Sequence, residues 1–226
     1  MTPLATGGRF CFFAVKEDRF NQKNYCRLYI VRHGETDWNI KGLMQGHQDI
    51  PLNKTGEEQA KQLAKKIQSV KFAGAFSSDL LRAKKTAEII ILEKKLMVKT
   101  TEALRERKFG RFEGTRWREN KTYQKLLSRF LKLSYKERYN KKPYEDTESD
   151  EELMGRFINF LREVALAYPG KNILVVTHGG VMRAFLIHLG YGSYETLPFG
   201  SIGNTALIKL ASDGVDFFIE ETFGVR

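Results

Sequence analysis

Short apolar runs alternate along the chain with longer segments in which apolar residues recur every three or four positions. The short runs predict strands, because strands buried on both faces of a parallel sheet are short and apolar throughout. These strands are expected over 26–31, 73–76, 96–100, 173–177, 205–210 and 217–220. The last two flank the turn Ser212-Asp213-Gly214 and predict a hairpin. Alternating strands and helices predict a three-layer α/β/α sandwich with a mostly parallel central sheet.

Two of the amphipathic segments carry capping-box signals at their starts. Thr55 followed by Glu58 predicts the N-terminus of a helix with a narrow apolar face. Ser149 followed by Glu152 predicts the start of a second helix, which should end near Pro169.

Two further predicted helices begin next to candidate site residues. Ser77-Ser78-Asp79 predicts the N-cap of a helix that extends to Leu92 and places Arg82 in its first turn. The positive end of a helix dipole disfavours a cation there, so Arg82 is interpreted as functional. Gly179-Gly180 opens a helix over 181–189, whose free N–H groups would face a phosphate near His178.

Length and cysteine content limit the possible classes of protein. The 226 residues suffice for one domain with an inserted subdomain, and no apolar run approaches the roughly 20 residues of a membrane helix. Only Cys11 and Cys26 are present, so neither a disulfide scaffold nor a cysteine zinc site is indicated, and a cytoplasmic location is expected. Residues 1–25 are interpreted as a tail, a mis-assigned start or a peripheral strand; the domain is expected over 26–226.

The net charge of +11 is concentrated between Arg116 and Lys142. This segment holds ten lysines and arginines against two glutamates, and it is interleaved with aromatic residues, which would suit a nucleic-acid surface. However, its larger apolar side chains follow helical spacing, which favours a buried helix face with the cations in solvent. That face comprises Tyr123, Leu126, Leu127, Phe130 and Leu131. We therefore expect residues 108–148 to form a cationic helical cap that attracts anionic substrates, and no nucleic-acid or membrane partner.

Two of the four histidines stand at the ends of predicted strands. Arg32-His33-Gly34 follows the strand over 26–31, and His178-Gly179 follows the strand over 173–177. Ligands of open α/β sheets bind outside the carboxyl ends of the strands. The two histidines therefore predict an active site at this edge.

These residues and several further motifs resemble the histidine phosphatase superfamily, in its phosphoglycerate mutase-like branch. The resemblance covers roughly residues 27–210. The matching blocks are Arg32-His33-Gly34-Glu35-Thr36, Trp38-Asn39, Gln45-Gly46, 49–53, 76–87, 104–110, Glu113-Gly114, Glu148-Ser149 and His178-Gly179-Gly180.

The resemblance implies a phosphoglycerate mutase-like fold and a phosphohistidine intermediate on His33. It implies a catalytic set of Arg32, His33, Arg82, Glu106 and His178, with Glu106 as acid and base. Phosphate contacts are expected from Arg32, Thr36, Asn39, Gln45, Gly46, Arg82, His178 and Gly179. The arginines should also keep His33 neutral by disfavouring its protonated form. No metal or cofactor is expected, because the same arginines would repel a cation.

Three functions are compatible with the resemblance. Mutases of the family typically have Asn where Gly180 stands, and the block 105–114 resembles phosphatases, so a metal-independent phosphatase acting on small phosphomonoesters is favoured. A phosphoglycerate mutase and a catalytically silent phospholigand- or protein-binding member are the alternatives. Thr147 replaces the usual Gly before Glu148-Ser149, which bears on how the cap contacts its substrate.

Overall fold

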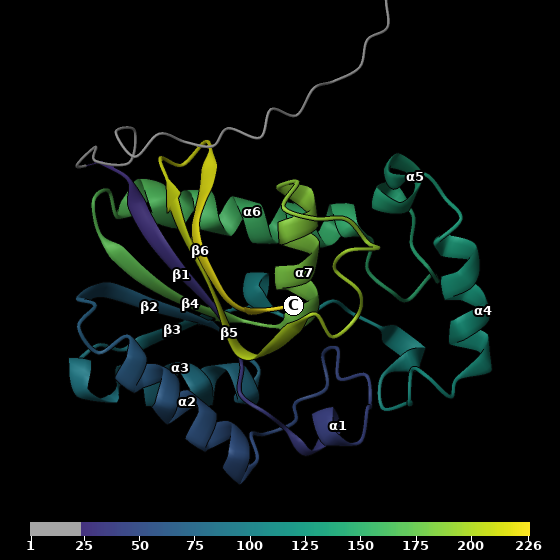
Figure 1. Cartoon of the computed structure of the whole chain (residues 1–226), viewed down its shortest axis with the longest axis horizontal. Helices are drawn as coiled ribbons and strands as arrows, with labels where there is room; N and C mark the ends of the chain where they lie inside the picture. The colour runs from purple at the N-terminus through teal and green to yellow at the C-terminus, as the bar shows by residue number, and fades with distance from the viewer. Residues whose placement is uncertain (1–23) are drawn as a thin grey trace, which may run out of the picture.

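The computed structural model describes residues 24–226, and within them six strands form one sheet (Figure 1). The strands are β1 (Cys26–Arg32), β2 (Phe72–Ser78), β3 (Val98–Thr101), β4 (Asn172–Thr177), β5 (Ile202–Ser212) and β6 (Phe217–Val225). Their order is β3-β2-β4-β1-β5-β6. The first four are parallel, and β5 and β6 form an antiparallel hairpin beside β1. The prediction for residues 1–25 falls almost entirely outside the described residues.

Helices cover both faces of the sheet, which confirms the three-layer α/β/α prediction (Figure 1). One face carries α2 (Lys54–Lys66) and α3 (Leu81–Ile91), and the other carries α6 (Asp150–Ala167) and α7 (Gly179–His188). Successive residues of β1 point to opposite faces, so Leu28 packs with α6 and α7 while Tyr29 packs with α2 and α3. None of the helices in the described residues combines the length and apolar character needed to cross a membrane.

Short elements lie around the carboxyl edge of the parallel strands. These are α1 (Asp37–Ile40), α4 (Lys121–Phe130), α5 (Tyr135–Asn140) and the 3-10 turns η3 (Glu102–Leu104) and η4 (Gly110–Phe112). A further 3-10 turn, η2 (Leu92–Lys94), follows α3 at the opposite edge, where Lys94 donates to the Val70 carbonyl at 2.7 Å. The helices α4 and α5 stand beside α7 rather than over the sheet (Figure 1). We refer to residues 108–148 as the cap.

The sequence prediction for the start of α2 was wrong. Its N-cap is Asn53, whose side-chain oxygen accepts a hydrogen bond from the Gly56 N–H at 2.8 Å. The Asn53 side chain also donates to Glu35 in the loop after β1, at 3.0 Å. Asn53 therefore serves both segments, which Thr55 inside the helix does not. By contrast, the capping box of Ser149 and Glu152 at the start of α6 is confirmed.

The predicted cap of α3 was also wrong. Strand β2 continues to Ser78, and Leu80 takes the N-cap position without a side-chain cap bond. Instead the Leu81 N–H donates to the carboxylate of Asp49, 32 residues earlier, at 2.7 Å. Asp79 is unavailable as a cap because its carboxylate binds the Arg105 guanidinium at 2.9 and 3.1 Å.

The apolar face predicted for the first cap helix is only partly buried. Tyr123 is buried against Met44 and Phe112, whereas Leu131 is 48% exposed. The prediction of a buried face therefore holds for the start of α4 and fails at its end.

Two glycines allow α2 to approach the loop that follows β1. A Cβ atom on Gly34 would overlap the Gly56 carbonyl, and a Cβ atom on Gly56 would overlap the backbone of Glu35. Neither position leaves space for a side chain. The first turn of α2 therefore packs directly on the backbone next to His33.

We expect Gly56→Ala to lower the free energy of unfolding by roughly 1–3 kcal/mol, because overpacking displaces backbone atoms. The measurement is chemical denaturation. Gly155→Ala is the matched control, since Gly155 also lies inside a helix but has open space around its Cβ position. It should stabilise the protein by roughly 0.5–1 kcal/mol. Equal effects of both substitutions would contradict the packing argument.

Candidate active site

The parallel pairing of β1 and β4 brings the two strand-end histidines together. Arg32 lies opposite Thr177, so His33 and His178 leave the sheet side by side. Their ring centroids are 5.1 Å apart at an interplanar angle of 60°. Both rings are buried, with exposed fractions of 3% for His33 and 0% for His178.

The protonation of His33 is fixed by its surroundings. Its Nδ1 lies 2.7 Å from the Gly34 carbonyl oxygen, which only accepts, so Nδ1 carries the proton and Nε2 keeps its lone pair. Burial lowers the pKa of His33 well below the ordinary value of 6.5, and the charges of Arg82 and Arg32 lower it further. His33 is therefore neutral at physiological pH.

His178 is neutral for similar reasons. Burial is the largest cause of its lowered pKa, followed by the charge of Arg82 and by His33. Neither of its ring nitrogens has a hydrogen-bond partner among residues 24–226. It forms the N-cap of α7, so it stands at the positive end of that helix.

Two arginines provide positive charge next to the histidines. Arg82 is fully buried and donates to the carbonyl oxygens of Gln48 at 2.7 Å and Gly46 at 2.8 Å. Arg32 donates to the Ile202 carbonyl at 2.5 Å. Burial lowers the pKa of Arg82 to about 10, so it remains charged at neutral pH. Within the described residues neither guanidinium has a salt bridge, and the Nε atom of each is buried without a partner.

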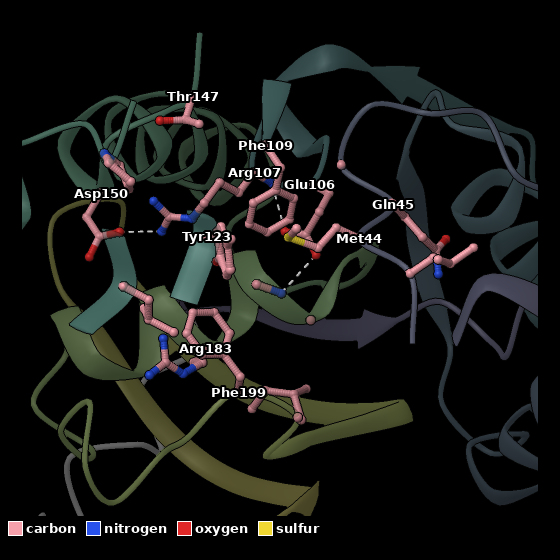
Figure 2. Close-up of a pocket in the computed structure, with 18 of the residues that line it drawn as sticks. Met44, Gln45, Glu106, Arg107, Phe109, Tyr123, Thr147, Asp150, Arg183 and Phe199 are labelled. Carbon is pink, nitrogen blue, oxygen red and sulfur yellow. Dashed lines mark hydrogen bonds and ion pairs between the residues drawn. The ribbon is translucent and has the colours of Figure 1, made fainter. Parts of the chain in front are cut away.

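Glu106 is held in place by backbone groups. Its carboxylate accepts hydrogen bonds from the N–H of Arg107 at 2.7 Å and of Gly180 at 2.9 Å (Figure 2). Its carbonyl oxygen accepts from Arg156 at 3.0 Å and lies 2.9 Å from the His47 ring nitrogen. A Cβ atom on Gly180 would lie 2.5 Å from the carboxylate, so glycine at this position lets Glu106 reach the start of α7.

A cavity of about 220 Å³ joins most of the predicted site residues. Its wall includes Arg32, His33, Asn39, Gln45, Gly46, Arg82, Glu106 and Gly179. Thr36 and His178 lie behind this wall. Thr36 caps α1, and its hydroxyl accepts a hydrogen bond from the Gln45 side chain at 2.7 Å. The structure thus gives Thr36 a role in orienting Asn39 and Gln45.

The cap contributes a part of the wall that the sequence analysis did not assign. Its apolar portion comprises Phe109, Tyr123, Leu126, Leu127, Phe130 and Leu131. Arg107, Asp150 and Arg183 add charged groups, and Figure 2 shows Arg107 and Asp150 at one end of the view with Gln45 at the other. The helical spacing of the cap residues was visible in the sequence, but which surface they face depends on tertiary packing.

In the described part of the chain, no cluster of three or more His, Cys, Asp or Glu side chains is arranged to hold a metal ion. The positive charge at the histidines comes from Arg32 and Arg82. The groups present are a neutral imidazole, two guanidinium ions and a carboxylate. Together they suit the transfer of a phosphoryl group.

Comparison with known proteins identifies relatives with such an activity. The family model for the histidine phosphatase superfamily (branch 1) matches residues 28–223. The chain is 33% identical over 192 residues to "Uncharacterized phosphatase PhoE" of Bacillus subtilis (strain 168), covering 85% of this chain and 89% of that protein. It is 31% identical over 189 residues to the "Metal-independent phosphoserine phosphatase" of Arabidopsis thaliana, covering 80% and 76%. A crystal structure of phosphoglycerate mutase from Bacillus anthracis str. Sterne superimposes with a TM-score of 0.76 at 27% identity, covering 89% and 94%.

The two buried histidines should make stability fall in mild acid. Their pKa values are lowered in the folded chain, so below pH 6.5 the unfolded chain binds protons that the folded chain does not. Unfolding by urea at pH 7.5 and pH 5.5 should show a loss of roughly 1 kcal/mol per buried histidine at the lower pH. His33→Gln should lose roughly 1 kcal/mol less over the same interval. An unchanged loss in this variant would show that His33 is not held neutral.

Proposed function

The chain belongs to the histidine phosphatase superfamily (branch 1) and is a phosphomonoester hydrolase, and we propose that it works through a phosphohistidine formed on His33. The observation that carries this proposal is the tautomer of His33. With Nδ1–H bound to the Gly34 carbonyl, the neutral ring offers Nε2 as the nucleophile.

In the first step, Nε2 of His33 attacks phosphorus and the bond from phosphorus to the ester oxygen breaks. The bonding electrons leave with that oxygen, which takes a proton from Glu106. Arg32 and Arg82 offer unpartnered buried donors to the phosphoryl oxygens, and the ring of His178 lies beside them. These charges stabilise the transition state because they are already in place before the reaction.

In the second step, water attacks the phosphohistidine. Glu106, now ionised, takes a proton from the water, the bond from phosphorus to Nε2 breaks, and its electrons return to His33. Inorganic phosphate is released and the enzyme regains its first state. Both steps use only side chains of this protein, so we propose a metal-independent reaction.

Among substrates, small phosphorylated acids are proposed first, because relatives include a phosphoserine phosphatase. A solved relative is described as a phosphoserine phosphatase in complex with 3-phosphoglyceric acid. Some relatives carry mutase names, so the assays include conversion of 3-phosphoglycerate to 2-phosphoglycerate. The cytoplasmic location expected from the sequence remains a prediction.

We expect His33→Ala to reduce phosphate release from p-nitrophenyl phosphate and phosphoserine by about 10⁴-fold or more, with EDTA present throughout. Labelled substrate quenched in alkali should leave label on the wild-type protein and none on the variant. His188→Ala is the control, because His188 lies at the end of α7, outside the cavity wall. Isomerisation without net phosphate release would establish a mutase. No turnover of any phosphomonoester would indicate a phospholigand-binding protein.

Glu106→Gln should slow the hydrolysis of alkyl phosphates by about 10²–10⁴-fold, because it removes the proton donor for the leaving oxygen. With p-nitrophenyl phosphate the leaving group needs little protonation, so the first step should be nearly unaffected. Rapid mixing should then show a burst of p-nitrophenol followed by slow turnover. Equal losses on both substrates, without a burst, would exclude Glu106 as the general acid.

A further inference from the structure

A group of charged and aromatic side chains lines the cavity, and Figure 2 shows two of them, Asp150 and Arg183, on the side of the view opposite Gln45. We refer to it as the distal cluster. It consists of Arg107, Arg138, Asp150, Arg183 and Tyr194. These residues come from the loop after η3, from α5, from the start of α6, from the middle of α7 and from the segment after α7. The proposed mechanism uses none of their side chains.

The single carboxylate of the distal cluster is already fully used. One oxygen of Asp150 accepts from the Arg107 guanidinium and the other accepts from the Tyr194 hydroxyl. Arg107 is further fixed by donating to the Glu148 carbonyl at 3.0 Å. The negative charge of Asp150 is therefore paired with Arg107 and does not neutralise Arg138 or Arg183.

Within residues 24–226 the hydrogen bonds of the Arg183 guanidinium go to neutral acceptors only. It donates to the carbonyl oxygens of Leu197 at 2.5 Å and Tyr194 at 3.3 Å, and its guanidinium lies 4.6 Å from the centre of the Phe199 ring. Carbonyl oxygens satisfy its donors without cancelling its charge. Burial lowers the pKa of Arg183, which reflects the cost of holding this cation away from water.

Arg138 is the least satisfied member of the distal cluster. Its side chain is 10% exposed and stacks on Tyr194, with the guanidinium 4.3 Å from the ring centre. Its Nε and Nη1 atoms are buried, and neither has a hydrogen-bond partner within residues 24–226. The nearest carboxylate, Glu195, lies 3.8 Å from Nη2 and is 70% exposed, so it contributes little. A buried cation with unpaired donors is costly unless an anion binds it.

Apolar side chains line the same cavity as the distal cluster and the catalytic groups. They are Leu126, Leu127 and Phe130 of α4, together with Met44 and Phe109. These residues offer no charge to a bound molecule. The cations of α4, which are Lys121, Lys125 and Arg129, are exposed, and in the described part of the cap Arg138 is the cation that lines the cavity.

We propose that the distal cluster binds a carboxylate of the substrate, with Arg138 as its principal donor and Arg183 as a second cation. The substrate is then a phosphomonoester whose other end carries the carboxylate and whose middle is uncharged and apolar. This inference rests on the proposed function, because it takes the phosphate of the same molecule to lie at His33. It makes Arg138 a residue that determines specificity and plays no part in the chemical step.

The test compares matched substrates that differ only in the distal charge. Phosphate monoesters of ω-hydroxy fatty acids with four, six and eight carbons are each assayed against the alkyl phosphate of equal length. Wild-type enzyme should show a higher kcat/KM for the carboxylate ester at one or more lengths, expressed through KM. Arg138→Met should reduce this preference by about tenfold or more, through a loss of kcat/KM for the carboxylate esters that far exceeds any change for the alkyl phosphates.

Arg129→Met is the matched control, because Arg129 lies on an exposed part of α4 outside the cavity wall and its loss changes the net charge equally. It should keep the wild-type preference. If thermal melting shows that Arg138→Met disturbs the cap, Arg138→Gln repeats the comparison. A wild-type enzyme without preference at any length, or a preference that both Arg138 variants retain, overturns the proposal. Hydrolysis of the alkyl phosphates by wild type and its loss in His33→Ala would leave the proposed function standing in that case.

Discussion

The structure of the site depends on burying two neutral imidazole rings beside two guanidinium ions that lack carboxylate partners in the described chain. Burial and the arginine charges both favour the neutral form of His33, so one arrangement supplies the nucleophile and the phosphate-binding charge. It is tolerated because the arginines donate to backbone carbonyls of nearby loops. The close contact of Gly34 and Gly56 fixes the backbone that carries His33.

The features that the sequence predicted correctly are those that depend on local pattern and on the direction of the strands. Parallel strands end at one edge, so an apolar run followed by His-Gly at two places was sufficient to bring His33 and His178 together. The caps of α2 and α3 could not be predicted in the same way. Asn53 and Asp49 act there through contacts with segments distant in sequence. A local capping signal such as Thr55-Glu58 contains no information about those distant contacts.

The composition of the cap did not predict the character of the surface that it turns to the cavity. The charge between residues 116 and 142 predicted a cationic surface, but the wall that faces the cavity is largely apolar. The helical spacing of apolar and charged residues in α4 predicts two faces but does not determine which of them lines the cavity. Arg138 could not be distinguished from the exposed cations around it until α5 was placed against α6 and Tyr194.

Gly180 lies in the first turn of α7, where its N–H contacts Glu106, the proposed general acid. The proposed reaction uses Glu106 twice, first as a proton donor and then as a base for water, so the carboxylate must stay in one position through both steps. The Gly180 N–H donates to Oε2 of the carboxylate at 2.9 Å, and a larger residue would place its Cβ 2.5 Å from the other oxygen, Oε1. A side chain at position 180 would therefore displace the carboxylate from the start of α7. Glycine at this position therefore keeps Glu106 at the start of α7, where the proposed mechanism needs it.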